Sequence, residues 1–192
     1  MFFRKNAVQH AIESNDASLK NQRGVSLNEF ILYSGLAALA IAATLAGYQV
    51  AKSSNDYNNI ADGMTRTKAQ LMTAFSSGVN TGASFNNLKA SLPAEWKVDA
   101  TTKIAGAGPM KGVKFDLTPD ATDSTLLTLD MANVPQDICM KAIPMLGGGW
   151  NAASKVGSAT TIVDANGNLQ AGSIAGGCTD ATNNTVDLAF NI

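Results

Sequence analysis

The sequence predicts an α+β protein: a long N-terminal α-helix, transmembrane and then amphipathic, packed on an antiparallel β-sheet head domain with one disulfide. Three observations predict this fold class. An uncharged run of 22 residues, Phe30 to Ala51, is followed by apolar residues at helical spacing. No proline occurs between Met1 and Leu92, so one helix can continue through both parts. The C-terminal part contains segments in which apolar and polar residues alternate, as in strands.

The uncharged run is long enough to cross a membrane. As a helix, the 22 residues from Phe30 to Ala51 span about 33 Å, close to the thickness of a bilayer's hydrocarbon core. The preceding residues 1–24 carry four basic and two acidic side chains, a net charge of +2. Positive charge before the span predicts that the N-terminus stays in the cytoplasm.

The second half of the predicted helix is one-sided. After Lys52, large apolar residues recur at spacings of three, four and seven, which places them on one face: Tyr57, Ile60, Met64, Leu71 and Phe75. The helix is expected to run from Val25 to Phe75 and to end near residues 76–78. This asymmetry predicts that the first half meets other subunits and the second half packs on the chain's own domain.

The remaining elements are short. Residues 78–110 are expected to form a connecting loop with short elements, among them one over residues 84–92. A short helix is expected over 135–145, because Pro135 suits its first turn and Pro144 with the glycines that follow ends it. Strands are expected over residues 113–117, 125–131, 160–163 and 186–192.

Composition argues against an enzyme. The formal net charge is -1 and only 15% of residues are charged, so no basic surface suggests direct nucleic-acid binding. The single histidine, His10, lies in the polar N-terminal stretch. Without it, the rest of the chain has neither a histidine-dependent nucleophile pair nor the usual histidine-containing zinc site. We expect no catalytic residues, cofactor or metal, although a hydrolase that uses only carboxylates remains an alternative.

Four weaker patterns receive structural interpretations. Asp164-x-Asn166-x-Asn168 has the glycine of a calcium loop in the wrong place, so a hairpin turn is favoured. The glycines at 147–149 and 106–108 lack the lysine and flanking elements of a phosphate-binding loop. Trp96 and Trp150 are expected to pack in the core or its rim. Asp116 and Asp120 are expected in a turn-rich, solvated stretch.

Three interpretations of the N-terminus compete. A secretory signal peptide would be cut after its apolar core, for example after Ala40, but this run is too long and continues into helical patterning. A plain membrane anchor fits the length and leaves Glu29, an acid at the edge of the apolar span, without a role. The third interpretation rests on the residues around Gly24.

The sequence Gly24-Val25-Ser26-Leu27-Asn28-Glu29 resembles the type IV prepilin signature. The resemblance implies that a dedicated peptidase cleaves between Gly24 and Val25, that the amine of Val25 is methylated, and that Glu29 is an assembly charge. Val25 replaces the usual phenylalanine and Asn28 an apolar residue. This start and the long leader resemble the type IVb branch, as in bundle-forming, toxin-coregulated and plasmid-borne thin pili. The motif and span cover residues 23–52, and the layout of the rest is similar.

The resemblance implies a division into three parts. Residues 1–24 are a leader peptide removed by prepilin peptidase. Residues 25–52 are the apolar half of the helix, which is transmembrane first and then forms the filament core. Residues 53–192 are a globular head that includes the amphipathic half of the helix, the sheet and the Cys139–Cys178 region.

The two cysteines, Cys139 and Cys178, are expected to form a disulfide. Their even number in a chain with an export signal favours a bridge over a metal or redox motif, and two buried free thiols are the alternative. A bridge would close a loop of about 40 residues and stabilise the fold by roughly 4 kcal/mol on the chain-entropy model. By resemblance to pilins, this region is expected on the exposed flank of the subunit.

The predicted function is that of a structural subunit of a bacterial type IV pilus. The chain would enter the inner membrane as a precursor and then self-assemble, with the assembly machinery, into an extracellular helical filament for adhesion, aggregation or conjugation contact. A cell-surface receptor is a possible partner, and direct nucleic-acid binding is not expected. The alternatives are a minor pilin or secretion pseudopilin, and a membrane-anchored extracytoplasmic binding domain.

Overall fold

The computed structural model describes residues 26–192, and the predicted leader and cleavage site lie outside these residues. The chain divides at Val50/Ala51 into two compact units. The first contains the apolar half of helix α2 (Leu27–Ala74), and the second contains the rest of α2 and the head. Each unit is described by itself.

Helix α2 agrees with the predicted bounds at its C-terminal end. It ends at Ala74. In the turn that follows, Gly78 has a φ of +71°, a left-handed conformation that glycine adopts without steric cost. The predicted apolar face is confirmed, because Ile60, Met64 and Leu71 are fully buried within the head. Gly63 lies on the same stretch, where a Cβ would come within 2.9 Å of Pro93 Cγ, so only glycine admits this close packing.

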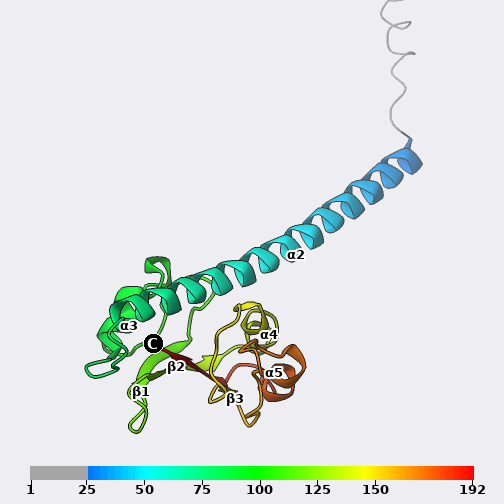
Figure 1. The fold of residues 1–192 in the computed structure, drawn as a ribbon. Helices are drawn as coiled ribbons and strands as arrows, with labels where there is room; N and C mark the ends of the chain where they lie inside the picture. The colour runs from blue at the N-terminus through cyan, green and yellow to red at the C-terminus, as the bar shows by residue number, and fades with distance from the viewer. Residues whose placement is uncertain (1–25) are drawn as a thin grey trace, which may run out of the picture. The chain divides into compact units, whose positions relative to one another are not determined.

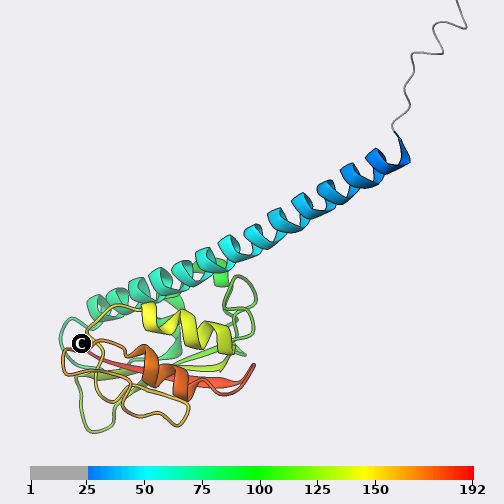
Figure 2. The same cartoon turned by 90° about the vertical axis from the view of Figure 1, so that its right-hand side faces the viewer.

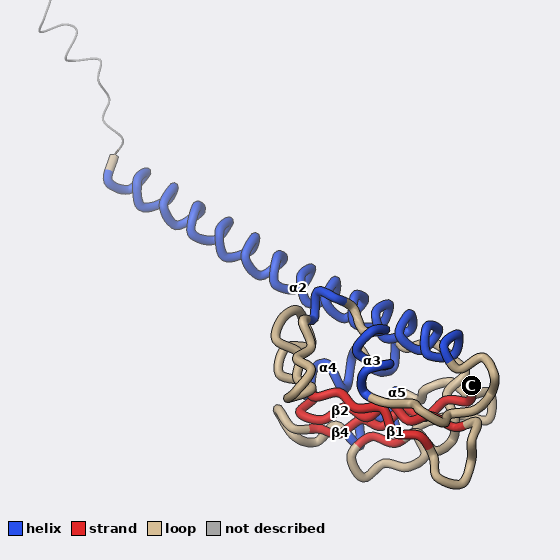
Figure 3. Tube along the Cα trace, turned by 90° about the vertical axis from the view of Figure 1, so that its left-hand side faces the viewer, coloured by secondary structure: helices blue, strands red, loops and turns tan. Residues whose placement is uncertain are grey.

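The head contains a four-stranded antiparallel sheet in the order β1-β2-β4-β3. Its strands are β1 (Lys114–Pro119), β2 (Leu126–Val134), β3 (Lys155–Val156) and β4 (Asn184–Asn191). The second half of α2 lies across one face of this sheet (Figures 1 and 3). The predicted strands at 113–117, 125–131 and 186–192 are confirmed as β1, β2 and β4, with small shifts of their ends.

Side chains of the three longer strands point to the two faces of the sheet, and those on the inner face form buried rows. Facing side chains such as Phe115, Met131 and Val186 share one register position and are buried, and Leu117, Leu129 and Leu188 form the next buried row. Trp96 stacks on Phe115 with ring centroids 5.7 Å apart, which ties the connecting segment to this core.

Short helices complete the head: α3 (Phe85–Ser91), η1 (Ala94–Trp96), α4 (Gln136–Lys141), η2 (Ile143–Met145) and α5 (Ala171–Gly177). The predicted helix over 135–145 is divided into α4 and η2, because Pro144 removes an α-helical hydrogen-bond donor. Helices α4 and α5 lie side by side (Figure 2, yellow and orange).

One predicted strand is wrong. Residues 160–163 form only an isolated bridge, Val163 with Leu169, on the way into the turn at Asp164. The place next to β4 is occupied instead by β3, since Lys155 and Val156 pair with Asp187 and Val186. The strand-like composition of 160–163 was therefore outweighed by the turn chemistry of the residues that follow. The fold class itself is confirmed.

Candidate functional site

The most unusual surface among the described residues is the first half of α2. Every residue from Leu27 to Ala51 is exposed. By length and composition, this helix is long and apolar enough to cross a membrane. The exposed large side chains are Leu27, Phe30, Ile31, Leu32, Tyr33, Leu36, Leu39, Ile41, Leu45, Tyr48 and Val50.

These eleven side chains cannot remain in water without a large penalty. Burying each one is worth about 1.5–3 kcal/mol, so together the eleven represent roughly 17–33 kcal/mol. That exceeds the 5–15 kcal/mol that stabilises a typical folded domain. An apolar surface of this kind marks a membrane or protein contact.

Glu29 lies at the edge of this surface and takes part in a reciprocal hydrogen-bond pair with Ser26. The backbone N–H of Ser26 donates to Glu29 Oε2 at 3.0 Å, and the backbone N–H of Glu29 donates to Ser26 Oγ at 3.2 Å. Since Phe30 N donates to Ser26 O at 2.9 Å, Ser26 is the N-cap of α2. The two residues form a capping box.

This capping box gives Glu29 a local role that the sequence interpretation missed. The signal was present, because Ser26-x-x-Glu29 before an apolar run is the capping-box pattern. The box places the carboxylate at the N-terminal end of α2, where the helix dipole also favours negative charge. Gly24 and Val25, the predicted cleavage and methylation sites, lie outside the described residues.

The predicted disulfide is present. Cys139 on α4 is bonded to Cys178, the residue after α5, with an S–S distance of 2.03 Å. Both cysteines are buried, so the bridge lies inside the α4–α5 layer. Gln136 Nε2 also donates to Cys178 O at 3.0 Å, a second link between the same two segments.

A buried lysine joins α2 to the glycine loop at 147–149. Lys68 Nζ donates to Gly148 O at 3.0 Å and to Gly149 O at 2.6 Å, and lies 4.2 Å from the centroid of the Trp150 ring. Burial lowers the pKa of Lys68. The backbone carbonyls of the glycine triplet thus accept hydrogen bonds from the ammonium group of Lys68 on α2.

The other sequence patterns are structural in this fold. Asp164 Oδ1 accepts from the backbone N–H groups of Asn166 and Asn168 at 2.8 Å, which confirms the turn. These hydrogen bonds, that of Asn168 first, lower the pKa of Asp164. Trp96 and Trp150 are 1% and 4% exposed, which confirms core packing.

The expectation that Asp116 lies in a turn-rich stretch is wrong, whereas its place in the predicted strand over residues 113–117 is confirmed. Asp116 lies in strand β1, and its Oδ2 accepts from Lys103 Nζ at 2.6 Å. Asp120 follows the strand in an exposed turn, as expected. No group of three or more potential metal ligands occurs within residues 26–192.

Comparison with known proteins gives one family match, which covers the sheet region. Residues 112–191, fewer than half of the chain, match the family model described as PilS N terminal, and PilS is a type IVb pilin. This is a match to structural, non-enzymatic proteins, in agreement with the prediction that the chain is not an enzyme.

No curated protein matches the sequence. Among solved structures, the chain is similar to the crystal structure of TcpA, a type IV pilin from Vibrio cholerae El Tor biotype. That similarity has a TM-score of 0.45 and 14% sequence identity, and it covers 70% of this chain and 98% of that chain.

Proposed function

We propose that this chain is a type IVb-like pilin, a structural subunit that self-assembles through the apolar half of α2 into an extracellular fibre. The observation that carries the proposal is the fully exposed apolar surface from Leu27 to Ala51, with one acid, Glu29, at its edge. The match of the sheet region to a pilin family supports the same function.

The apolar half of α2 would be covered first by membrane lipid and later by other copies of the chain. In the inner membrane, lipid covers the segment, and contact between copies brings no hydrophobic gain because lipid is equally apolar. Outside the membrane, the same side chains must be covered by other copies of the segment. Transfer from one environment to the other therefore requires work from an assembly machine.

Glu29 supports a defined register between copies. Cleavage after Gly24 would create a charged amine at Val25, four residues before the carboxylate. Burying either ion alone in a dry filament costs several kcal/mol, and pairing them between neighbouring copies offsets much of this cost. We propose that the amine of one copy meets Glu29 of another.

The sheet edges argue against polymerisation by strand addition. On edge strand β1, Phe115 N donates to Lys103 O and Leu117 N donates to Asp116 Oδ1, and Pro119 has no N–H. Alternate residues of a strand point their N–H groups to the same edge, so these three donors are all occupied or absent. Such protection is typical of strands that must not pair with another chain.

The opposite side of the sheet is covered too. Gly157 N donates to Thr185 O beside β3, Asn151 N donates to Ala189 O, and Ala189 N donates to Ser154 Oγ. The part of β4 beyond β3 is thus bonded to the chain's own loop. Strand addition at these positions would break hydrogen bonds within the head, which favours self-association through the apolar half of α2.

Intact-protein mass spectrometry of sheared surface fibres tests the proposal. The expected mass lacks residues 1–24, includes one added methyl group and is two hydrogens lighter because of the Cys139–Cys178 bridge. An unprocessed Met1 terminus on surface material, or a terminus near Ala40, would favour a membrane-anchored or secreted binding domain. Abundance of the chain in the fibres separates a major pilin from a minor one.

Adhesion, aggregation and contact during conjugation are the proposed uses of the fibre. The proposed partners are other copies of the chain, prepilin peptidase, the assembly machinery and a cell-surface receptor. The precursor would reside in the inner membrane, and the product would be extracellular.

A further inference from the structure

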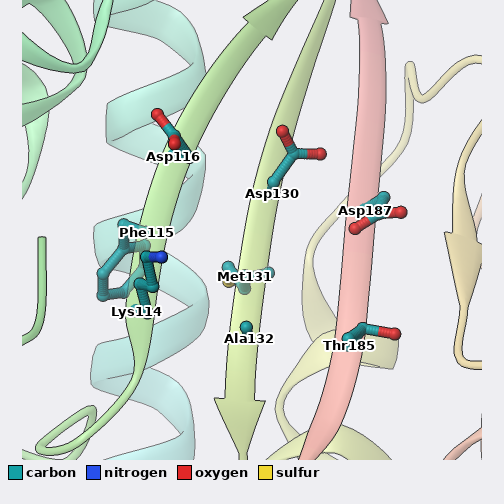
Figure 4. Close-up of a pocket in the computed structure, with 8 residues that line it drawn as sticks. All are labelled: Lys114, Phe115, Asp116, Asp130, Met131, Ala132, Thr185 and Asp187. Atoms are coloured by element: carbon teal, nitrogen blue, oxygen red, sulfur yellow. The ribbon is translucent and has the colours of Figure 1, made fainter.

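The outer face of the sheet places three carboxylates directly opposite one another. Asp116 on β1 pairs with Asp130 on β2, and Asp130 pairs with Asp187 on β4. Figure 4 shows the three side chains on three neighbouring strands. All three line a hollow of about 220 Å³. Like charges directly opposite destabilise a sheet, so this arrangement has an energetic cost at neutral pH.

The two outer carboxylates have cationic partners. Lys103, from the turn before β1, lies 2.6 Å from Asp116 Oδ2. Lys155 on β3 is the register partner of Asp187 and lies 3.2 Å from its Oδ2. The row across the sheet is therefore Lys103, Asp116, Asp130, Asp187 and Lys155, with Lys114 exposed on the same face of β1.

The central carboxylate is held differently. Thr118 Oγ1 donates a hydrogen bond to Asp130 Oδ2, and among the described residues no lysine or arginine forms an ion pair with Asp130. Burial, followed by the charges of Asp187 and Asp116, raises the pKa of Asp130, against the opposing effects of Thr118 and Lys155. Its ionised form is thus the one that the fold disfavours.

We propose that this charged row makes the head a pH-sensitive element, in which proton uptake by Asp130 relieves the repulsion across β1, β2 and β4 and strengthens the fold. The proposal concerns the head alone and does not depend on whether the chain forms fibres. The head becomes more resistant to unfolding as the pH falls toward the ordinary aspartate pKa.

The direction follows from linkage. A carboxyl whose folded-state pKa is raised binds its proton more tightly in the folded than in the unfolded chain. Above the raised pKa the group destabilises the fold in full, and this penalty disappears as the pH falls toward the ordinary aspartate value. Each unit of difference corresponds to about a tenfold change in the folding equilibrium constant.

The opposing groups act at lower pH. Hydrogen bonds lower the pKa values of Asp99, Asp120, Asp123 and Asp164, those from Thr102, Thr122, Thr125 and Asn168 being the largest causes. Their stabilising effect is present above the ordinary aspartate pKa and is lost only as the pH falls through their lowered values. Stability is therefore expected to rise as the pH falls toward the ordinary aspartate pKa and to decrease below it.

The test is urea unfolding of the full chain in detergent micelles between pH 8 and about pH 4, close to the ordinary aspartate pKa. Trp96 and Trp150 are both buried in the head, so their fluorescence reports its unfolding. The expected wild-type midpoint rises as the pH falls. Asp130→Asn removes the charge with little change of shape, and its midpoint should exceed the wild-type value at pH 8 and lose this rise.

Asp120→Asn is the matched control. It removes an exposed charge outside the row and keeps the Oδ1 that accepts from the backbone N–H groups of Thr122 and Asp123, so the wild-type rise between pH 8 and about pH 4 should be retained. A flat or falling wild-type midpoint over this range overturns the proposal, and so does a folded Asp130→Asn variant that keeps the rise. If Asp130→Asn does not fold, carboxyl ¹³C titration of the wild type decides, because absence of an Asp130 midpoint above the ordinary range also overturns it.

Discussion

Glu29 has two separable roles, a local cap and an assembly charge, and substitutions can distinguish them. Glu29→Gln keeps the side-chain oxygen that accepts from Ser26 N at 3.0 Å, because glutamine also suits a capping box. The start of α2 should therefore stay intact. The charge is lost, so the proposed partner amine in the filament is left buried without a counter-ion.

The magnitudes separate the two roles. Breaking a buried ion pair by removing one partner costs about 3–5 kcal/mol per contact. This lowers the association constant by a factor of roughly 10² to nearly 10⁴. Loss of a cap costs about 0.5–2 kcal/mol. Ser26→Ala removes the hydroxyl that accepts from Glu29 N at 3.2 Å and leaves the carboxylate in place. It should weaken the helix start and preserve assembly.

The assay is the yield of sheared fibres, compared with the amount of processed, disulfide-bonded subunit in the membrane. Glu29→Gln and Glu29→Ala should both abolish fibres while processed subunit accumulates, and Ser26→Ala should retain fibres. Wild-type fibre yield from Glu29→Gln would refute the assembly-charge role. Loss of fibres from Ser26→Ala equal to that from Glu29→Gln would show that the cap, and not the charge, is what assembly requires.

Three further predictions concern the head. Lys68→Met keeps the volume of the lysine and leaves the carbonyls of Gly148 and Gly149 without their donor, so urea unfolding should show a loss of about 1–3 kcal/mol. An unchanged midpoint would mean that water replaces the ammonium group. Cys139→Ser, or reduction of the bridge, should destabilise the head by about 2–5 kcal/mol, and equal stability with and without reductant would contradict this. Gly63→Ala should lower the thermal midpoint, because its Cβ would lie 2.9 Å from Pro93 Cγ, whereas Gly172→Ala in α5 meets nothing within 4 Å and should be neutral or stabilising.

The elements that the sequence predicted well are those whose signal is local and long. The 22-residue uncharged run and the spacing of Ile60, Met64 and Leu71 predict both halves of α2, because the helical period repeats over many residues. Strand β1 alternates over residues 114–118, whereas β2 and β4 alternate over only part of their length and were recognised also by their apolar and β-branched residues. The capping box of Ser26 and Glu29 was readable too, although the family signature drew attention to Glu29 alone.

The elements that were missed depend on contacts distant in sequence. β3 is only two residues long and is a strand because Lys155 and Val156 lie beside β4, while the more strand-like residues 160–163 lead into a turn. Helix α5 contains three glycines in seven residues, so propensity argues against it. Its position against α4 and the bridge to Cys139 supply the stabilisation that its sequence lacks.

The sequence by itself determined the parts of this protein that act alone: an apolar helix that cannot remain in water, an acid at its edge, and two cysteines that pair. These follow from composition and local periodicity, which need no knowledge of the fold. Only the tertiary structure decided which groups meet. The lysine between α2 and the glycine loop, and the row of Asp116, Asp130 and Asp187, exist because strands and helices distant in sequence lie in register. Electrostatic energy depends on these distances, so the charge properties of the head could not be derived from the order of its residues.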